Sequence, residues 1–277
     1  MIFAMSNIAW APDERLSAYA ALAEAGMRGL EIAPGILFDG AEDPMDPDAA
    51  TADRAMGELA DHGLQLVSMQ SLLYGVEDAA LFGDDGQQQR FTDAMHRAID
   101  LAGRFAIPNL VFGSPRQRLI PKRTDDDAAI DHAANTFAAL ADRATEAGTV
   151  IAMEPNPAAY GTNFLTSLQE AAAFVAAVDH PALRLNFDLG AVIMNGDAAR
   201  APDLARAVAS HVHHVHVSEP DLAPAPADPA ALAPVLSALA EKGYDRAVSI
   251  EMRRTDAGLA DVASRIAALA QAREIRS

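Results

Sequence analysis

The sequence contains no cysteine, so disulfide bonds, thiolate zinc sites and a cysteine nucleophile are excluded. Aromatic residues are scarce, at 5% of the 277 residues, and Trp10 is the only tryptophan. Hydrophobic residues nevertheless make up 51% and charged residues 22%, which is enough apolar surface for a packed core. We therefore expect a folded globular protein whose chemistry depends on side chains other than thiols.

Positively charged residues are also few. Lys and Arg number 21 against 39 Asp and Glu, which gives a formal net charge of −18. Such a surface repels nucleic acids and anionic membranes, because binding to either depends on clustered Lys and Arg. No apolar run approaches the roughly 18 residues that a membrane-spanning helix needs, and the opening residues lack a signal-peptide pattern. We expect a cytoplasmic protein that binds a small molecule; a homo-oligomer is compatible with this composition.

Short apolar runs alternate with longer alanine-rich amphipathic runs along the chain. The short runs are apolar on both faces, as buried parallel strands are. Strands are predicted at Ile2–Met5, Gly29–Ile32, Leu64–Met69, Asn109–Phe112, Thr149–Met153, Leu183–Phe187, Val212–Val217 and Ala247–Met252. Helices are predicted between them at Pro12–Ala25, Ala49–Asp61, Gln88–Phe105, Asp125–Ala147, Ser167–Val178, Pro202–Ser210, Pro229–Lys242 and Gly258–Arg273.

The number and order of these elements favour one α/β architecture. Eight strands, each followed by a helix, match a single (β/α)₈ TIM barrel domain over residues 1–277. The main alternative is a doubly wound sheet, which normally has fewer strands. The sequence also has no Gly-x-Gly-x-x-Gly after any strand and no P-loop, so the barrel is the prediction.

Polar residues gather where the predicted strands end, which is where barrel enzymes carry their chemistry. Four of them, on strands five to eight, have the character of metal ligands: Glu154, Asp188, His216 and Glu251. Three converging carboxylates would repel one another, and a divalent cation removes that cost. Three oxygen ligands and one imidazole suit Mn²⁺ or Mg²⁺ first, with Co²⁺ or Zn²⁺ as alternatives.

Each of these residues taken alone has a plainer interpretation. A carboxylate at a strand end is often a helix cap, and a histidine in a strand is often a hydrogen-bonded core residue. Along Val212–Val217 the side chains alternate, so we predict that His214 and His216 share one face while His213 points the other way. The occurrence of all four ligand types together favours the metal site.

Several motifs in sequence order make the chain similar to a known superfamily. They are AMSNIAW at 4–10, GLEIAP at 29–34, FGSP at 112–115, AMEPNP at 152–157, NFD at 186–188, HVHV at 214–217 and SIE at 249–251. Together they resemble the xylose isomerase-like barrel superfamily, in its branch of sugar phosphate isomerases and epimerases. The resemblance extends over nearly the whole chain, and the superfamily's metal quartet falls on the same four ligand residues.

The resemblance implies an isomerase or epimerase of a sugar, a sugar phosphate or a related hydroxy-carbonyl compound. In such enzymes two metal-bound glutamates remove and return a proton beside a metal-polarised carbonyl, and these roles fall on Glu154 and Glu251. Three positions depart from the pattern of ketose 3-epimerases: Ala191 replaces a His, Leu222 an Arg and Tyr160 a Glu. These departures argue against a standard free-ketose epimerase.

Substrate contacts are predicted from polar and aromatic side chains near the strand ends. They are Asn7, Trp10, Glu31, Gln70, Ser114, Arg116, Asn156, His214, Glu219 and Arg253. A basic cluster of Arg116, Arg118, Lys122 and Arg123 either holds a phosphate or carboxylate or is a solvated loop. Trp10 either walls the pocket or packs under a loop, and the others serve equally well as loop-bracing groups.

Three further functions remain open at this point. A metal-dependent lyase or dehydratase of a polyol or cyclic hydroxy-ketone would use the same proton abstraction and then expel a hydroxyl. An endonuclease IV-like enzyme shares the barrel, but it needs extra histidines on strands two to four and a surface that attracts DNA. A non-catalytic ligand-binding barrel would not need all four metal ligands.

Overall fold

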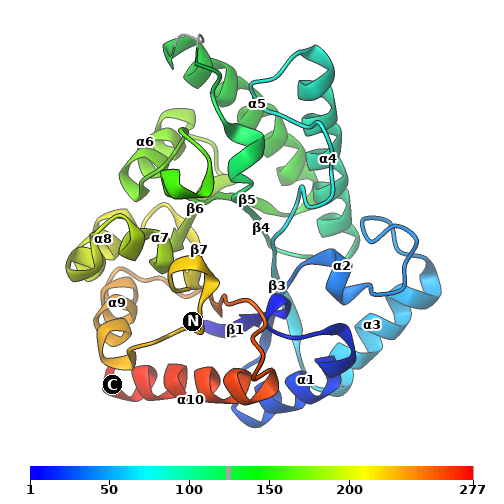
Figure 1. Cartoon of the computed structure of the whole chain (residues 1–277), viewed down its shortest axis with the longest axis vertical. Helices are drawn as coiled ribbons and strands as arrows, with labels where there is room; N and C mark the ends of the chain where they lie inside the picture. Colours follow the sequence, from blue (N-terminus) through cyan, green and yellow to red (C-terminus); the bar gives the residue numbers. More distant parts are fainter. Residues whose placement is uncertain (123–125, 277) are drawn as a thin grey trace.

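Parallel strands in the order β1 to β8 close into a barrel in which β8 pairs with β1, and helices surround it (Figure 1). The computed structural model describes residues 1–122 and 126–276. Within these residues the strands are β1 (Ile2–Ser6), β2 (Gly29–Ile32), β3 (Gln65–Met69), β4 (Asn109–Phe112), β5 (Val150–Met153), β6 (Leu183–Asp188), β7 (Val212–Val217) and β8 (Ala247–Ile250). The predicted barrel is confirmed, and each strand lies within two residues of its predicted bounds.

The predicted helices are present, and short ones join them. The long helices are α1 (Arg15–Glu24), α3 (Ala49–Asp61), α4 (Asp85–Arg104), α5 (Asp126–Ala147), α6 (Leu168–Val178), α8 (Ala201–Val208), α9 (Pro229–Glu241) and α10 (Leu259–Arg276). The sequence analysis missed α2 (Pro34–Leu37) and α7 (Leu189–Met194), which are too short to show a helical period. Asp125, the predicted start of α5, lies outside the described residues. No helix in the described part of the chain combines the length and apolarity needed to cross a membrane.

The scarce aromatic residues are concentrated where β4 meets its covering helices. Phe112 ends β4, and its ring centroid lies 4.9 Å from Phe137 of α5 and 5.7 Å from Phe91 of α4. Phe137 in turn lies 6.1 Å from Phe174 of α6. Edge-to-face packing of buried rings stabilises the fold by more than the burial of their apolar surface alone would. This cluster therefore anchors the end of β4 beside the strand ends that carry the candidate site.

Strand β7 departs from simple alternation. Leu185 of β6 pairs with Val212 and Asn186 with His214, so His213 is an extra residue in β7. Its Nδ1 lies 2.8 Å from Oδ1 of Asn109 on β4, a strand that is not next to β7 in the barrel. The prediction that His213 points away from the barrel interior is therefore wrong, because a β-bulge shifts the alternation by one residue.

The His213 contacts require a neutral ring. Nε2 accepts a hydrogen bond from the Arg246 guanidinium at 2.6 Å, so the proton sits on Nδ1 and is donated to Asn109. Burial, together with the charge of Arg246, lowers the pKa of His213 to about 3. The unfolded chain therefore binds one more proton than the folded chain between about pH 3 and its ordinary pKa near 6.5.

We expect His213→Asn to make the protein less sensitive to acid. In the parent, this residue should lower the free energy of unfolding by up to about 1.4 kcal/mol for each pH unit below 6.5, because the unfolded state takes up the proton. Urea unfolding at several pH values between 6.5 and 4 measures the slope of the unfolding free energy against pH. His96→Asn, on the outer helix α4, is the control and should leave it unchanged. Equal slopes in the parent and both variants would contradict the prediction.

Candidate metal centre

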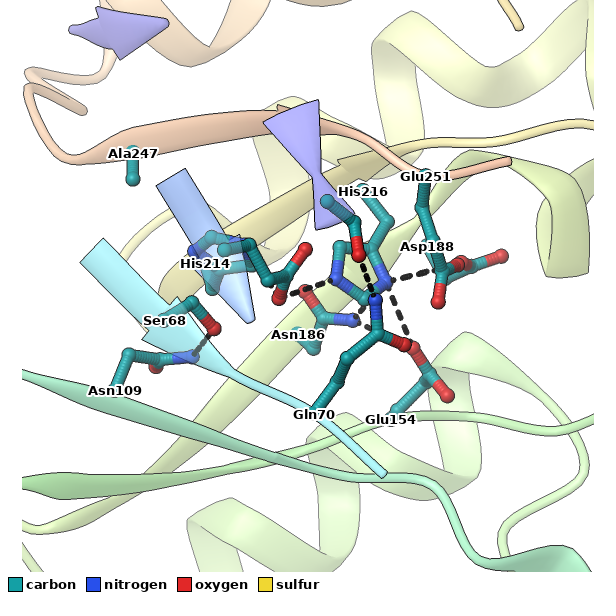
Figure 2. Close-up of polar contacts among 12 residues, drawn as sticks. Ser68, Gln70, Asn109, Glu154, Asn186, Asp188, His214, His216, Ala247 and Glu251 are labelled. Atoms are coloured by element: carbon teal, nitrogen blue, oxygen red, sulfur yellow. Dashed lines mark hydrogen bonds and ion pairs between the residues drawn. The ribbon is translucent and has the colours of Figure 1, made fainter. Parts of the chain in front are cut away.

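The four predicted ligands converge at the carboxyl-terminal end of the barrel. Glu154 directly follows β5, Asp188 ends β6 and Glu251 directly follows β8. Asp188 pairs in register with His216 of β7, and His216 pairs with Ser249, two residues before Glu251. Because alternate residues of a strand share a face, these side chains point to the same place. Figure 2 shows His216 beside the three carboxylates.

The donor atoms are close enough for one ion. His216 Nδ1 lies 3.0 Å from Glu154 Oε1, 3.2 Å from Glu251 Oε2 and 3.5 Å from Asp188 Oδ2. One ligand atom from each of the four residues lies within 4.8 Å of the others. The histidine side chain is fully buried, and the carboxylates are at most 13% exposed. Three carboxylate oxygens and one imidazole nitrogen fit a hard or borderline divalent cation.

The pKa shifts of these four side chains show which positive charge a metal cation would replace. Burial, with the neighbouring carboxylates, raises the pKa of Glu251 to about 7, and burial also raises the pKa of Asp188. For Glu154, burial is outweighed by His216, and the pKa is lowered. Burial opposes protonation of His216 too, but Glu251 and Glu31 outweigh it and raise its pKa well above the ordinary value. The imidazolium is thus the cation among the carboxylates, and a divalent ion would take its place as Nδ1 loses its proton.

Glu31 lies on the other side of the His216 ring. Its Oε1 is 3.0 Å from His216 Nε2 and 3.3 Å from His214 Nε2, and all three side chains are fully buried. Burial alone would raise the pKa of Glu31, but the two imidazoles outweigh it and keep the carboxylate charged. A carboxylate bonded to one ring nitrogen leaves the other nitrogen facing the ligand position. Glu31 therefore lies where it can orient His216, and His214 packs edge-on against the His216 ring; both had been predicted as substrate contacts.

Amide and hydroxyl side chains hold the carboxylates in place. Asn186 Nδ2 donates to Glu154 Oε1 at 2.8 Å, and Asn156 Nδ2 donates to Glu154 Oε2 at 3.0 Å. Ser218 Oγ donates to Asp188 Oδ2 at 2.9 Å. The other oxygen of Asp188 accepts from the backbone N–H of Ala191 and caps α7, so this residue is both a helix cap and a member of the cluster. Asn186 and Ser218 were missed, although Asn186 lies two residues before Asp188 and Ser218 two residues after His216, and that spacing was the available signal.

A cavity of about 410 Å³ opens above the cluster, and the three carboxylates form part of its wall. Among the predicted substrate contacts, those that line it are Arg116, Asn156, Glu219 and Arg253. All three positions that depart from the ketose 3-epimerase pattern, namely Tyr160, Ala191 and Leu222, also line this cavity. The departures are therefore located where a substrate would lie.

A second cavity of about 420 Å³ adjoins the first, with which it shares Glu154 and Arg116. Gln70 and Ser114, two further predicted contacts, line this second cavity. Gln70 Nε2 also donates to Ser6 Oγ at 2.5 Å, which fixes the amide at the cavity wall. Six of the ten predicted contacts thus line these two neighbouring cavities.

Two predicted contacts belong to the core. Asn7 is 1% exposed, and its amide exchanges hydrogen bonds with the backbone of Ala33 at 2.7 and 3.2 Å. Trp10 is 2% exposed and packs edge-on against Tyr19, with ring centroids 6.2 Å apart. Neither side chain lines the two cavities in the described part of the chain. Asn7 therefore braces the backbone after β2, and Trp10 packs in the core against α1.

The predicted basic cluster is not one surface. Arg118 is fully buried, and its Nη2 donates to the backbone oxygen of Glu154 at 2.8 Å. Burial lowers the pKa of Arg118 to about 10, and the charge of Glu154 opposes that shift. The segment Pro115–Arg118 is a 3₁₀ helix with three residues per turn, so Arg116 and Arg118 point in different directions. Lys122 is exposed, and Arg123 lies outside the described residues.

Solved structures of known proteins share the fold of this chain. Among solved structures, the chain is similar to 3-keto-D-glucoside 4-epimerase from E. coli (16% identity, TM-score 0.74, 99% of both chains) and to D-psicose 3-epimerase from Clostridium cellulolyticum H10 (15%, 0.77, 100% of both chains). It is also similar to an AP endonuclease of family 2 from Brucella melitensis (23%, 0.66, 94% of this chain and 97% of that one). At these identities the likeness shows the fold alone. None of the curated proteins is a significant match.

The sequence itself shows the family. The family model described as xylose isomerase-like TIM barrel matches residues 19–274, which is most of the chain. This match confirms the resemblance inferred from the strand-end motifs. The protein belongs to the xylose isomerase-like TIM barrel family.

Proposed function

We propose that the protein is a divalent-metal-dependent isomerase or epimerase of a sugar, a sugar phosphate or a related hydroxy-carbonyl compound. One observation carries the proposal: Glu154, Asp188, His216 and Glu251 converge within 4.8 Å and open into a cavity suited to a small molecule. Burying three carboxylates together is costly unless a cation compensates them. Such a cluster on a cavity wall is better explained by a reaction than by packing.

The two glutamates are placed to move a proton. When bound, the divalent ion would supply the Lewis acidity that makes a hydrogen beside a substrate carbonyl easier to remove. Glu154 comes from β5 and Glu251 from β8, so the two carboxylates reach the cavity from separated strands. Both oxygens of Glu154 accept hydrogen bonds from asparagine side chains, whereas the carboxylate of Glu251, among the described residues, has His216 as its one polar partner. We assign proton removal and return to this pair, with Glu251 the freer base.

Arg116 and Arg253 are proposed to contact the substrate. Among the arginines whose side chains are described, these two alone have no side-chain hydrogen bond, ion pair or ring contact, and both line the cavity of the metal cluster. Several other arginines bond backbone oxygens or neutral side chains instead of carboxylates, so what sets these two apart is that their side chains have none of these partners. Their guanidinium groups suit a phosphate, a carboxylate or several hydroxyls.

The substrate is proposed to differ from a free ketose. The three cavity positions that depart from the ketose 3-epimerase pattern replace polar or charged groups by Ala191, Leu222 and Tyr160. The solved structures with the same fold include epimerases of a 3-keto-D-glucoside and of D-psicose, which supports a sugar-like substrate without fixing which one. β2, β3 and β4 contain no histidine, so the extra ligands expected of an endonuclease IV-like site are missing from these strands.

A proton-exchange assay in D₂O tests the proposed function. Protein loaded with Mn²⁺ or Mg²⁺ is incubated with a panel of ketoses, ketose phosphates and keto-glycosides. We expect deuterium at the carbon beside the carbonyl of at least one compound, and no deuterium when the metal is removed by a chelator. A product lighter by one water would instead identify the dehydratase. Absence of exchange and of any product across the panel would favour the non-catalytic binding barrel.

A further inference from the structure

Two further cavities lie beyond the first one, which is lined by Glu154, Asp188 and Glu251 and which we call the metal cavity. The second cavity shares Glu154 and Arg116 with the first, and a third cavity of about 560 Å³ shares Ser71, Tyr74, Gly75 and Val76 with the second. The three cavities therefore adjoin one another in a row from the metal cluster to the loops after β2 and β3, and we call this row the extended groove. A single sugar ring in the first cavity leaves the rest of this groove unfilled.

Tyr74 stands at the boundary between the second and third cavities. Its side chain is 89% exposed, the highest exposure among the large hydrophobic residues of the described chain. The two residues before it are buried, since Leu72 and Leu73 are 1% and 2% exposed. Tyr74 N–H donates a hydrogen bond to Ser71 O, and Val76 N–H donates one to Leu73 O, so the loop is closed by its own backbone. An exposed aromatic residue that lines a cavity is a contact surface for a ring.

The lining of the extended groove changes along its length. Around the second cavity it is mixed, and its polar residues are Gln70, Ser71, Ser114, Arg116, Gln117 and Glu154. Around the third it is mainly apolar, with the side chains of Ile8, Pro34, Ile36, Pro44, Met45 and Val76, and the Asp43–Arg97 ion pair at its edge. Polar groups next to the metal cavity suit hydroxyls and ether oxygens, and the apolar stretch beyond Tyr74 suits a ring with few polar groups.

We propose that the substrate is a keto-glycoside. Its reacting sugar, which carries a carbonyl away from the anomeric carbon, lies in the metal cavity, and its attached ring lies against Tyr74 in the extended groove. The inference rests on the proposed function for the identity of the reacting sugar. It adds the class of the substrate and the residue that selects it. Tyr74 is a specificity-determining residue that binds the far end of the ligand and does not touch the reacting carbon.

Binding of paired probes tests the proposal. Methyl β-D-glucoside and 4-nitrophenyl β-D-glucoside share the sugar and differ in the attached ring. We expect the metal-loaded protein to bind the nitrophenyl compound about tenfold more tightly in an NMR titration, because one aromatic contact is gained. Tyr74→Ala should bring the two affinities together, and Tyr74→Phe should retain the preference. Leu16→Ala, at an exposed residue of α1, is the control and should behave like the parent.

Several outcomes would overturn the proposal. They are equal affinity of the parent for both probes, absence of binding by the nitrophenyl compound, and a preference that persists in Tyr74→Ala. The molar mass in solution is measured in parallel, and a lower mass for Tyr74→Ala would mean that Tyr74 covers a second copy of the chain instead. Proton exchange on a small ketone is assayed separately: loss of exchange with retained ring preference would reject the proposed function and leave the subsite standing.

Discussion

Glu251→Gln is expected to lower proton exchange between solvent and substrate by about 10²- to 10⁴-fold while the protein stays folded. The amide keeps the size of the side chain and the contact that the carboxylate makes with His216 Nδ1 at 3.2 Å. It cannot accept the proton that the glutamate would remove. The measurement is the rate of deuterium incorporation into the substrate at saturating metal, with the metal content of each protein determined alongside.

The same assay separates a chemical role of Glu251 from a structural one. Glu24→Gln, at an exposed residue of α1, changes the charge equally and should retain the parent rate. Glu154→Gln is expected to lose exchange as well, because the proton must be both removed and returned. Exchange in Glu251→Gln at the parent rate would reject its assignment as the base.

The double variant Glu154→Gln/Asp188→Asn is expected to lose the metal that the parent binds. We expect about one equivalent of a divalent cation in the parent, because its four donor atoms lie within 4.8 Å of one another. The variant keeps hydrogen-bonding groups of similar shape, and Asn caps a helix about as well as Asp, so α7 should persist. Elemental analysis after dialysis against Mn²⁺ measures the difference.

Thermal unfolding gives an independent readout of the same site. A metal at about 1,000 times its dissociation constant stabilises the folded state by about 4 kcal/mol, and the double variant should lose this stabilisation. Glu42→Gln/Asp53→Asn, at exposed residues, removes the same charge and should respond to Mn²⁺ like the parent. A parent protein that takes up no metal and gains no stability with Mn²⁺ would overturn the metal centre.

The convergence of the four candidate ligands was predictable because of how parallel strands are connected. In a barrel of βα units all strands run the same way, so residues at their carboxyl ends must lie at one end of the barrel. Glu154, Asp188, His216 and Glu251 each occupy such a position, and the structure brings them together. The strand positions were also predictable, since buried parallel strands are apolar on both faces.

Contacts set by register and burial could not be predicted in this way. The bulge at His213 is visible only in the pairing of β6 with β7, and it overturns the alternation expected along the strand. Arg118 and Arg116 are two residues apart in sequence, yet one is buried against the backbone of Glu154 and the other lines the cavity. Sequence spacing alone does not tell which side of a short 3₁₀ turn faces the core.

By itself, the sequence determined the barrel, the family and the residues that end its strands, because these follow from local patterns repeated along the chain. Only the tertiary structure decided what each polar residue touches. It placed Glu31 against His216, Trp10 in the core and Tyr74 at the wall of a groove that continues from the metal cavity. These assignments depend on contacts between segments far apart in sequence, and such contacts exist only once the barrel has closed.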